Sequence, residues 1–388
     1  MSHANTIFNQ LLHLFPRHDF DKHVKAYEGN KNVRTFTCWN QFITLMYAQA
    51  KGHDSIRDII TGIKANSGKW YHIGLTEVAR STLSDANGNR DWRIYEGLFY
   101  DMLAHCKSVT PNHNFKFKNP LYSLDSSVID LCLSLFPWAE YKTTKGALKL
   151  HCLLDHRGCI PSFIHITEGK HHDVKVAKTL DLPLPPDSIL AIDRAYIDFK
   201  YLHKLHNDGV FFVTRAKSNM NYEITGQHKM PNKKGLIDDV SIMLCGYYQK
   251  QYYPQNLRLV TWRDEEKNRD FLFLTNNFKL AASTIAAIYK ARWQVELFFK
   301  WIKQNLKIKS FLGTSRNAVM TQIWVAMSYF LLLTYVKFQT RYKYSKLHLA
   351  RLFKETLMEK MSLIHLLSLD PDKGLKCIRP PTMQLNLF

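Results

Sequence analysis

The hydrophobic residues in the first hundred positions recur every three or four residues, which is the spacing of amphipathic helices. Helices are expected over residues 55–63, 76–86 and 92–106. The clearest helical pattern covers residues 39–50. That helix is indicated by one apolar set: Trp39, Phe42, Ile43, Met46 and Tyr47. The beginning of the chain is therefore expected to be helical.

Short helices joined by turns that contain Gly and Asn are compatible with a DNA-binding module over residues 1–112, and equally with an ordinary helical cap. In a DNA-binding module, Arg80, Ser81 and Thr82 would be available to contact phosphates or base edges. The formal net charge of +20 favours polyanionic partners, with nucleic acid ahead of an anionic membrane surface. We therefore interpret residues 1–112 as an N-terminal helical DNA-binding domain.

From residue 121 the pattern changes to the alternation of apolar and polar residues that is typical of β-strands. Strands are expected over residues 121–126, 147–154 and 159–167, and a turn over 155–158 joins the last two. The wholly apolar run Ile189–Ile192 predicts a short strand that is buried on both faces. The first three strands would form a meander.

Helices and one more strand complete this part of the chain. Asp173 can cap a helix over residues 174–180, a second helix is expected over 198–206, and a strand over 210–214. Three strands followed by helix, strand, helix and strand predict an α/β fold: a mixed sheet with helices on both faces, in the order of ribonuclease-H-like cores.

A β-rich insertion interrupts this core. Residues 217–275 are rich in Tyr, Ile, Val and Asn, and the helical pattern returns from residue 281. The insertion is expected to be all-β. The predicted units are an N-terminal helical DNA-binding domain (1–112), the first part of the ribonuclease-H-like catalytic core (113–216), the insertion (217–275), the second part of the core with a glutamate-bearing helix (276–342) and a helical basic tail (343–388).

Composition and cysteine usage narrow the class of protein. With 388 residues, 46% of them hydrophobic, the chain should fold into more than one structural unit. Its seven cysteines are scattered and form no C-x-x-C pair, which indicates a reducing compartment. The apolar stretch 323–336 is shorter than the about 20 residues of a membrane span, so we expect a buried helix and no membrane partner.

Six polar side chains share one face of the helix predicted over residues 289–307. At 100° per residue the set lies within one narrow sector: Tyr289, Arg292, Glu296, Lys300, Lys303 and Lys307. A solvated stripe of salt bridges would produce the same pattern, so this helix alone does not establish a site.

Two aspartates add to the case for a site. Asp125 lies in the first predicted strand, and Asp193 follows the buried strand Ile189–Ile192 directly. In the proposed sheet these strands are neighbours, so both carboxylates can emerge side by side, and Glu296 would complete a cluster. Three such charges are tolerable only with divalent cations, and oxygen ligands favour Mg²⁺ or Mn²⁺. Two ions of this kind support nuclease and strand-transfer chemistry on phosphodiesters.

The cations and aromatic residues around this cluster would then contact DNA. Arg292, Lys300 and Lys303 would hold phosphates, and Tyr289 could donate a hydrogen bond to a backbone oxygen. Trp293 could stack on an unpaired base or pack at a domain interface. Arg194, beside Asp193, is assigned to the same DNA-binding set.

These residues resemble the signatures of a known family, the Asp-Asp-Glu insertion-sequence transposases built around insertion sequence number four. The family's Tyr-Arg-Glu-Lys signature is matched by Tyr289, Arg292, Glu296 and Lys303. Its two aspartate motifs are similar to Leu124-Asp125-Ser126-Ser127 and Asp193-Arg194-Ala195-Tyr196, where a glycine more often stands at Ala195. The resemblance covers most of the chain, including the β-rich insertion.

The resemblance implies a ribonuclease-H-like core in which Asp125, Asp193 and Glu296 are catalytic and bind two Mg²⁺ or Mn²⁺ ions. It implies cut-and-paste transposition by a homodimer that brings together two inverted-repeat ends and joins them to target DNA. The ends would pass through DNA hairpins, with their terminal phosphates contacted by Tyr289, Arg292 and Lys303. Such an enzyme would be cytoplasmic and associated with the nucleoid of a bacterium.

Two alternatives remain open on the residues themselves. A ribonuclease-H-like, structure-specific DNA nuclease would use the same three carboxylates without joining DNA ends. A non-catalytic DNA-binding protein derived from a transposase would keep the basic surfaces alone, although an intact acidic triad argues against it.

Overall fold

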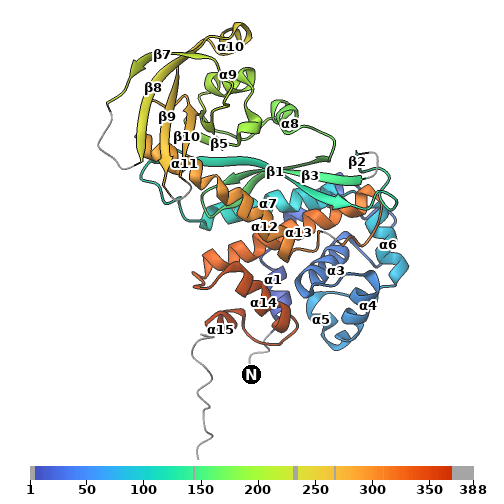
Figure 1. Ribbon diagram of the computed structural model, residues 1–388. Coiled ribbons are helices and arrows are strands. Elements are labelled where there is room, and N and C mark those ends of the chain that lie inside the picture. The colour runs from blue at the N-terminus through green and yellow to red at the C-terminus, as the bar shows by residue number, and fades with distance from the viewer. Residues whose placement is uncertain (1–4, 143–144, 230–234, 266–267, 309, 369–388) are drawn as a thin grey trace, which may run out of the picture.

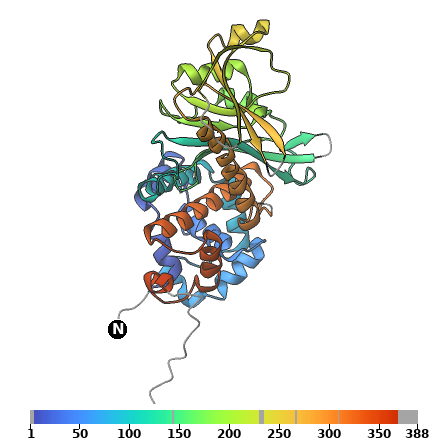
Figure 2. The same cartoon turned by 60° about the vertical axis from the view of Figure 1, so that its left-hand side comes forward.

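The computed structural model describes residues 5–142, 145–229, 235–265, 268–308 and 310–368 of the chain. One large mixed sheet has helices on both faces, and the two ends of the chain form a helical region on one side of it (Figures 1 and 2). The expected α/β architecture with helical regions at both ends is therefore present. The last part of the predicted basic tail, residues 369–388, lies outside the described residues.

The N-terminal region is helical, as the hydrophobic spacing predicts. Its helices are α1 (Ile7–Leu12), α2 (Arg17–Ala26), α3 (Cys38–Lys51), α4 (Ile56–Lys64), α5 (Trp70–Ile73), α6 (Arg80–Asn89) and α7 (Arg93–Val109), with a 3₁₀ turn η1 (Ser67–Lys69). Helix α3 begins with a capping box between Thr37 and Asn40. The helix expected from residue 76 begins only at Arg80, because the chain leaves α5 through Gly74 in the left-handed region and is extended at Ala79.

The C-terminal helices pack against this region. They are α13 (Arg316–Gln339), α14 (Lys346–Thr356) and α15 (Leu363–Ser368). Helix α13 is long and apolar enough to cross a membrane, but 94% of its most apolar stretch is buried within the protein. The prediction of a buried helix is therefore confirmed. Its packing partners include α7 and α3, so α13 forms the centre of the helical region.

Within the described residues, ten strands form the sheet, in the order β2-β3-β1-β5-β6-β10-β9-β8-β7 with β4 paired to β3. They are β1 (Leu121–Leu131), β2 (Glu140–Lys142), β3 (Lys145–Asp155), β4 (Ile160–Glu168), β5 (Ile189–Ile192), β6 (Phe211–Arg215), β7 (Tyr222–Gln227), β8 (Leu236–Leu244), β9 (Leu257–Asp264) and β10 (Arg269–Thr275). Strands β1, β3 and β4 form the predicted antiparallel meander, and β1 pairs in parallel with β5. The two strands that carry the aspartate motifs are therefore neighbours.

Helices cover both faces of the sheet. On one face lie α8 (Asp173–Thr179) and α9 (Phe199–Asn207), and on the other lie α11 (Ala282–Ala291) and α12 (Trp293–Asn305) (Figure 1). The expectation that Asp173 caps α8 is wrong. His172 holds the capping position without a side-chain hydrogen bond, and the Asp173 carboxylate is engaged by Ser126 and Lys149 instead.

The insertion extends the core sheet. Strand β10 pairs with the core strand β6, and β9, β8 and β7 follow outward. One short helix, α10 (Tyr247–Tyr252), lies among these strands and has no counterpart in the sequence prediction. The insertion thus places its inner strand β10 directly beside the core strand β6.

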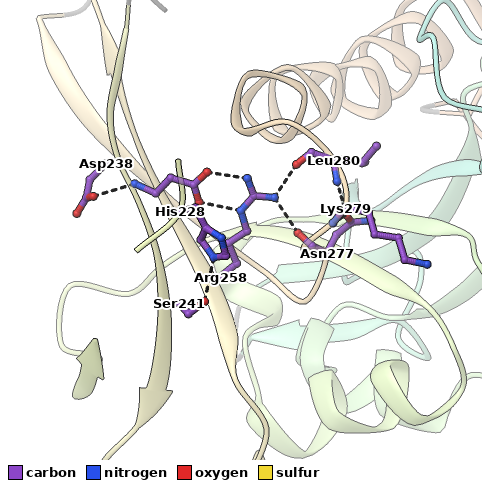
Figure 3. Close-up of polar contacts among 8 residues, drawn as sticks. His228, Asp238, Ser241, Arg258, Asn277, Lys279 and Leu280 are labelled. Carbon is purple, nitrogen blue, oxygen red and sulfur yellow. Dashed lines mark hydrogen bonds and ion pairs between the residues drawn. The ribbon is translucent and has the colours of Figure 1, made fainter. Parts of the chain in front are cut away.

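A buried ion pair ties the insertion to the helices that carry the site (Figure 3). Arg258 of β9 donates hydrogen bonds of 2.8 Å and 2.7 Å to the Asp239 carboxylate of β8. The same guanidinium donates to the carbonyl oxygens of Asn277 and Leu280, in the loop that leads into α11. Asn277 in turn accepts from the backbone N–H groups of Lys279 and Leu280. Arg258 therefore fixes the start of α11 relative to the sheet.

We predict that Asp239→Asn lowers the free energy of unfolding by about 3–5 kcal/mol, because it leaves the Arg258 guanidinium buried without its counter-charge. Urea denaturation of the whole chain measures the change. The exposed pair Arg263–Asp270 provides the matched control, and Asp270→Asn should cost at most about 1 kcal/mol. Equal effects of the two substitutions would contradict this role of Arg258.

Candidate active site

The two aspartates follow a register pair of neighbouring strands. Leu124 of β1 lies opposite Ile192 of β5, and Asp125 and Asp193 are the next residues of each chain segment. The Asp125 carboxylate accepts a 2.8 Å hydrogen bond from the backbone N–H of Ser126. Asp193 accepts from the N–H of Ala195 at 3.0 Å and so caps the 3₁₀ turn η2 (Arg194–Tyr196). Strand pairing thus brings the two carboxylates together, as predicted.

Glu296 comes from the first turn of α12. The helix packs on β1 and buries one apolar face in the core shared with the sheet and α13: Val295, Phe298, Phe299 and Ile302. This packing places Glu296 near Asp125, which lies within β1, and near Asp193, which follows the end of β5. The helical spacing that predicted the apolar face is confirmed.

One arginine contacts all three carboxylates. The Arg292 guanidinium lies 3.1 Å from Asp125, 2.6 Å from Glu296 and 4.0 Å from Asp193. Only 11% of its side chain is exposed. The structure therefore brings the three predicted acids to a single point, and a residue expected to contact DNA phosphates occupies that point.

The electrostatics of Asp125 follow from this placement. Burial raises the pKa of Asp125 to about 6, and the negative charges of Glu296 and Asp193 act in the same direction. The Ser126 N–H and the Arg292 guanidinium oppose this rise because they favour the charged form. The carboxylate cluster is thus held together by one positive charge.

The donor set fits a hard divalent cation. All three side chains offer oxygen ligands, and their common contact with Arg292 shows that they can surround one positive group. Across the described residues, no three His, Cys, Asp or Glu side chains form a ready metal-binding group. In this arrangement the guanidinium supplies the positive charge that a metal ion would supply.

The backbone around Arg292 departs from the single straight helix that the sequence predicts. Helix α11 ends at Ala291 and α12 begins at Trp293, with Arg292 between them. The N–H of Val295 donates to the carbonyl of Arg292, three residues back, so the helix tightens at this point. Tyr289 and Glu296 therefore belong to two joined helices, and the face computed for one continuous helix is only approximate.

A cavity of about 1170 Å³ opens beside the triad. Asp193, Arg292, Tyr289 and Trp293 line it on the core side. Its other wall comes from the insertion and β6, and contains aromatic and basic side chains that the sequence analysis did not single out: Arg215, Trp262, Arg263, Arg269, Phe271 and Phe273. The alternation of Arg269, Phe271 and Phe273 along β10 is the one sequence signal for a shared face.

The remaining predicted DNA-binding residues surround this cavity and helix. Trp293 is 55% exposed, and the Tyr289 ring lies against the Phe273 ring in a tilted arrangement, with 5.1 Å between the ring centroids. Lys300 is exposed one turn after Glu296, Lys303 is half-buried, and Arg194 is exposed on the turn after Asp193. The structure thus gathers basic and aromatic groups around the carboxylates.

Comparison with known proteins decides the family. The profile described as a transposase DDE domain matches residues 116–331, more than half of the chain. A transposase-named protein of Sinorhizobium fredii, y4zB, is 31% identical over 255 residues, which cover 65% of this chain and 69% of that protein. The chain belongs to the DDE transposase family.

Other relatives of this transposase come from bacterial insertion sequences. A Geobacillus stearothermophilus protein named as a transposase of element IS5377 is 28% identical over 69% of this chain and 70% of its own length. Residues 3–76 match a family described only as a domain of unknown function. A solved piggyBac transposase synaptic complex with hairpin DNA covers 91% of this chain and 78% of that chain, with a TM-score of 0.47 and 11% identity.

The predicted activity is therefore confirmed at the level of the family. The chain is a DNA transposase, an enzyme that cleaves DNA and transfers the cut strand. DDE transposases bind DNA and depend on divalent metal ions. The narrower subgroup with the Tyr-Arg-Glu-Lys signature stays a prediction.

We predict that Arg292→Met destabilises the metal-free transposase, because three carboxylates then face one another without a counter-charge. The loss should be about 2–4 kcal/mol, since Glu296 and Asp193 are about one-third exposed and partly screened by water. Added Mn²⁺ should raise the melting temperature of the variant more than that of the unchanged protein. The exposed Lys300→Met serves as control, and an identical response to Mn²⁺ in all three proteins would contradict the prediction.

Proposed function

We propose that Asp125, Asp193 and Glu296 are the catalytic carboxylates of this transposase and bind two Mg²⁺ or Mn²⁺ ions. The observation that supports this most directly is the convergence of the three side chains on the Arg292 guanidinium. When bound, such ions activate a water or a 3′-hydroxyl and stabilise the leaving oxygen of the phosphodiester. Asp125 is held by the Ser126 N–H and Asp193 by the Ala195 N–H, so both carboxylates are oriented before a metal ion binds.

The cavity beside the triad is proposed to hold the end of the transposon DNA. Its basic wall residues suit phosphates, and its aromatic residues suit the face of an unpaired base. Trp293 is exposed enough to stack, and Tyr289 and Arg292 lie where a terminal phosphate could reach both. Excision through DNA hairpins, whose ends carry strained and unpaired bases, would place such bases here.

Residues outside the cavity are proposed to hold the flanking DNA backbone. Lys300 and Lys303 extend the basic face of α12 away from Glu296, and Arg194 extends it beyond Asp193. Phosphate contacts of this kind fix the register of the duplex and carry no base specificity. They would therefore align the scissile bond with the three carboxylates.

The N-terminal helical region is proposed to recognise the DNA ends. The exposed first turn of α6 is formed by Arg80, Ser81 and Thr82. Helix α6 packs on α4, and α4 lies within residues 3–76, the match to the domain of unknown function. A short helix with an exposed polar first turn suits contact with a DNA groove. Two such chains, bound to two inverted repeats, would form the homodimer that cut-and-paste transposition into target DNA requires. Transposition of this kind would take place at the nucleoid, in the cytoplasm of a bacterium.

We predict that Asp125→Asn, Asp193→Asn and Glu296→Gln each lower DNA cleavage by at least about 1,000-fold, equivalent to about 4 kcal/mol of transition-state stabilisation. DNA affinity should be retained. The assay measures cleavage and joining of a plasmid that carries the DNA flanking this reading frame, and chelation by EDTA should abolish both. Cleavage without joined products would favour the simple nuclease, and full activity of any variant would exclude that residue from the triad.

We also predict that Arg80→Ala weakens binding to the transposon end and reduces the salt dependence of binding by about one ion. Cleavage at saturating DNA should not change, because Arg80 lies away from the triad. Fluorescence anisotropy at several salt concentrations measures both quantities. Asp85→Asn, on the same helix and also exposed, is the control, and unchanged binding by Arg80→Ala would remove α6 from the DNA interface.

A further inference from the structure

Asp173 lies directly behind the first aspartate motif. Successive side chains of a strand point to opposite faces, so Asp125 of β1 faces α12 while Ser126 faces α8. The Ser126 hydroxyl donates a 2.6 Å hydrogen bond to the Asp173 carboxylate, at the start of α8. The backbone N–H of the same serine holds Asp125. Ser126 therefore connects two carboxylates on opposite faces of the sheet.

The same oxygen of Asp173 is held by strand β3. Lys149 lies 3.2 Å from it and the nearly buried His151 lies 3.8 Å from it. Lys149 also donates to the carbonyl of His171, two residues before Asp173. Burial lowers the pKa of His151 to about 4, so this imidazole is neutral near pH 7 and Lys149 supplies the positive charge. Asp173 thus has a fixed position that does not depend on Ser126.

Helix α8 also reaches the second aspartate motif. It packs against the turn η2, which Asp193 caps. Tyr196, at the end of that turn, is buried, and burial together with the negative charges of Asp173 and Asp125 raises the pKa of its hydroxyl. The start of α8 therefore contacts both segments that carry the aspartates of the triad.

We propose that Asp173 is a positioning residue for strand transfer and cleavage: it anchors Ser126, and through it Asp125, in register with the turn that carries Asp193. The proposal rests on the proposed function of the two aspartates. Asp173 lies on the face of β1 away from Arg292, so it acts through Ser126 and not as a fourth member of the cluster. A carboxylate suits this place because one oxygen must accept from a hydroxyl and an ammonium together.

The test compares the rates at which the unchanged protein and its Asp173 variants cleave, in a single turnover, a plasmid that carries the DNA flanking this reading frame. Asp173→Ala should slow cleavage by about 10–100-fold, the range for residues that orient ligating carboxylates, with DNA affinity near that of the unchanged protein. Its melting temperature should fall, because the nearly buried Lys149 loses its counter-charge. Asp173→Asn keeps an acceptor for Ser126 but loses the charge facing Lys149. Its cleavage rate should therefore lie between the rates of Asp173→Ala and the unchanged protein. Asp181→Asn, an exposed carboxylate in the connector after α8, is the matched control.

A double-mutant cycle isolates the proposed link from general destabilisation. Ser126→Ala should slow cleavage by about 10-fold, whereas Ser126→Thr, which keeps the hydroxyl, should cleave at about the rate of the unchanged protein. The double variant Ser126→Ala/Asp173→Ala should cleave little more slowly than Asp173→Ala alone. If Asp173→Ala does not fold, the comparison of Ser126→Ala with Ser126→Thr tests the proposal by itself. Unimpaired cleavage by Ser126→Ala, or additive losses in the double variant, would overturn the proposal while Asp125→Asn stays inactive. Activity of Asp125→Asn itself would instead overturn the proposed function.

Discussion

Three carboxylates that meet at one point repel one another, and the structure keeps them there through one positive charge. Arg292 contacts Asp125, Glu296 and Asp193 with a side chain that is almost wholly buried. Burial alone would favour protonation of Asp125, and the guanidinium opposes it. One guanidinium offsets only part of the three negative charges, so divalent ions would add positive charge that the site still lacks.

The scaffold around this point is stiff for reasons that lie in separate parts of the chain. The parallel pairing of β1 and β5 aligns Leu124 with Ile192, and the aspartates follow. The apolar side of α12 fixes Glu296 from above the sheet, through packing shared with α13. The buried Arg258 holds the loop before α11 to β8 and β9, so the insertion also fixes where α11 begins. The two aspartates therefore depend on one strand pairing, and Glu296 depends on the separate packing of α12.

Local sequence patterns could predict much of this fold but not its polar contacts. Alternation and apolar runs located β1, β3, β4 and β5, because these strands are buried in the way their patterns indicate. The apolar face of α12 and the buried α13 followed from spacing for the same reason. Helical spacing could predict the local pair Arg292–Glu296. The contacts of Arg292 with Asp125 and Asp193, the pair Arg258–Asp239 and the partners of Asp173 join residues from different elements, and no local pattern encodes them.

The position of Arg292 also couples the two ligands that the proposed function requires. Its guanidinium contacts the carboxylates and lines the cavity beside them, so it can pair with either set of anions. If both ligands bind as proposed, a phosphate in the cavity would compete with the carboxylates for Arg292, and a divalent ion on the carboxylates would leave Arg292 available to a phosphate. By linkage each ligand must then strengthen the binding of the other by the same factor. On the proposed function, an arginine at this point would therefore couple metal binding by the carboxylates to the presence of a DNA end.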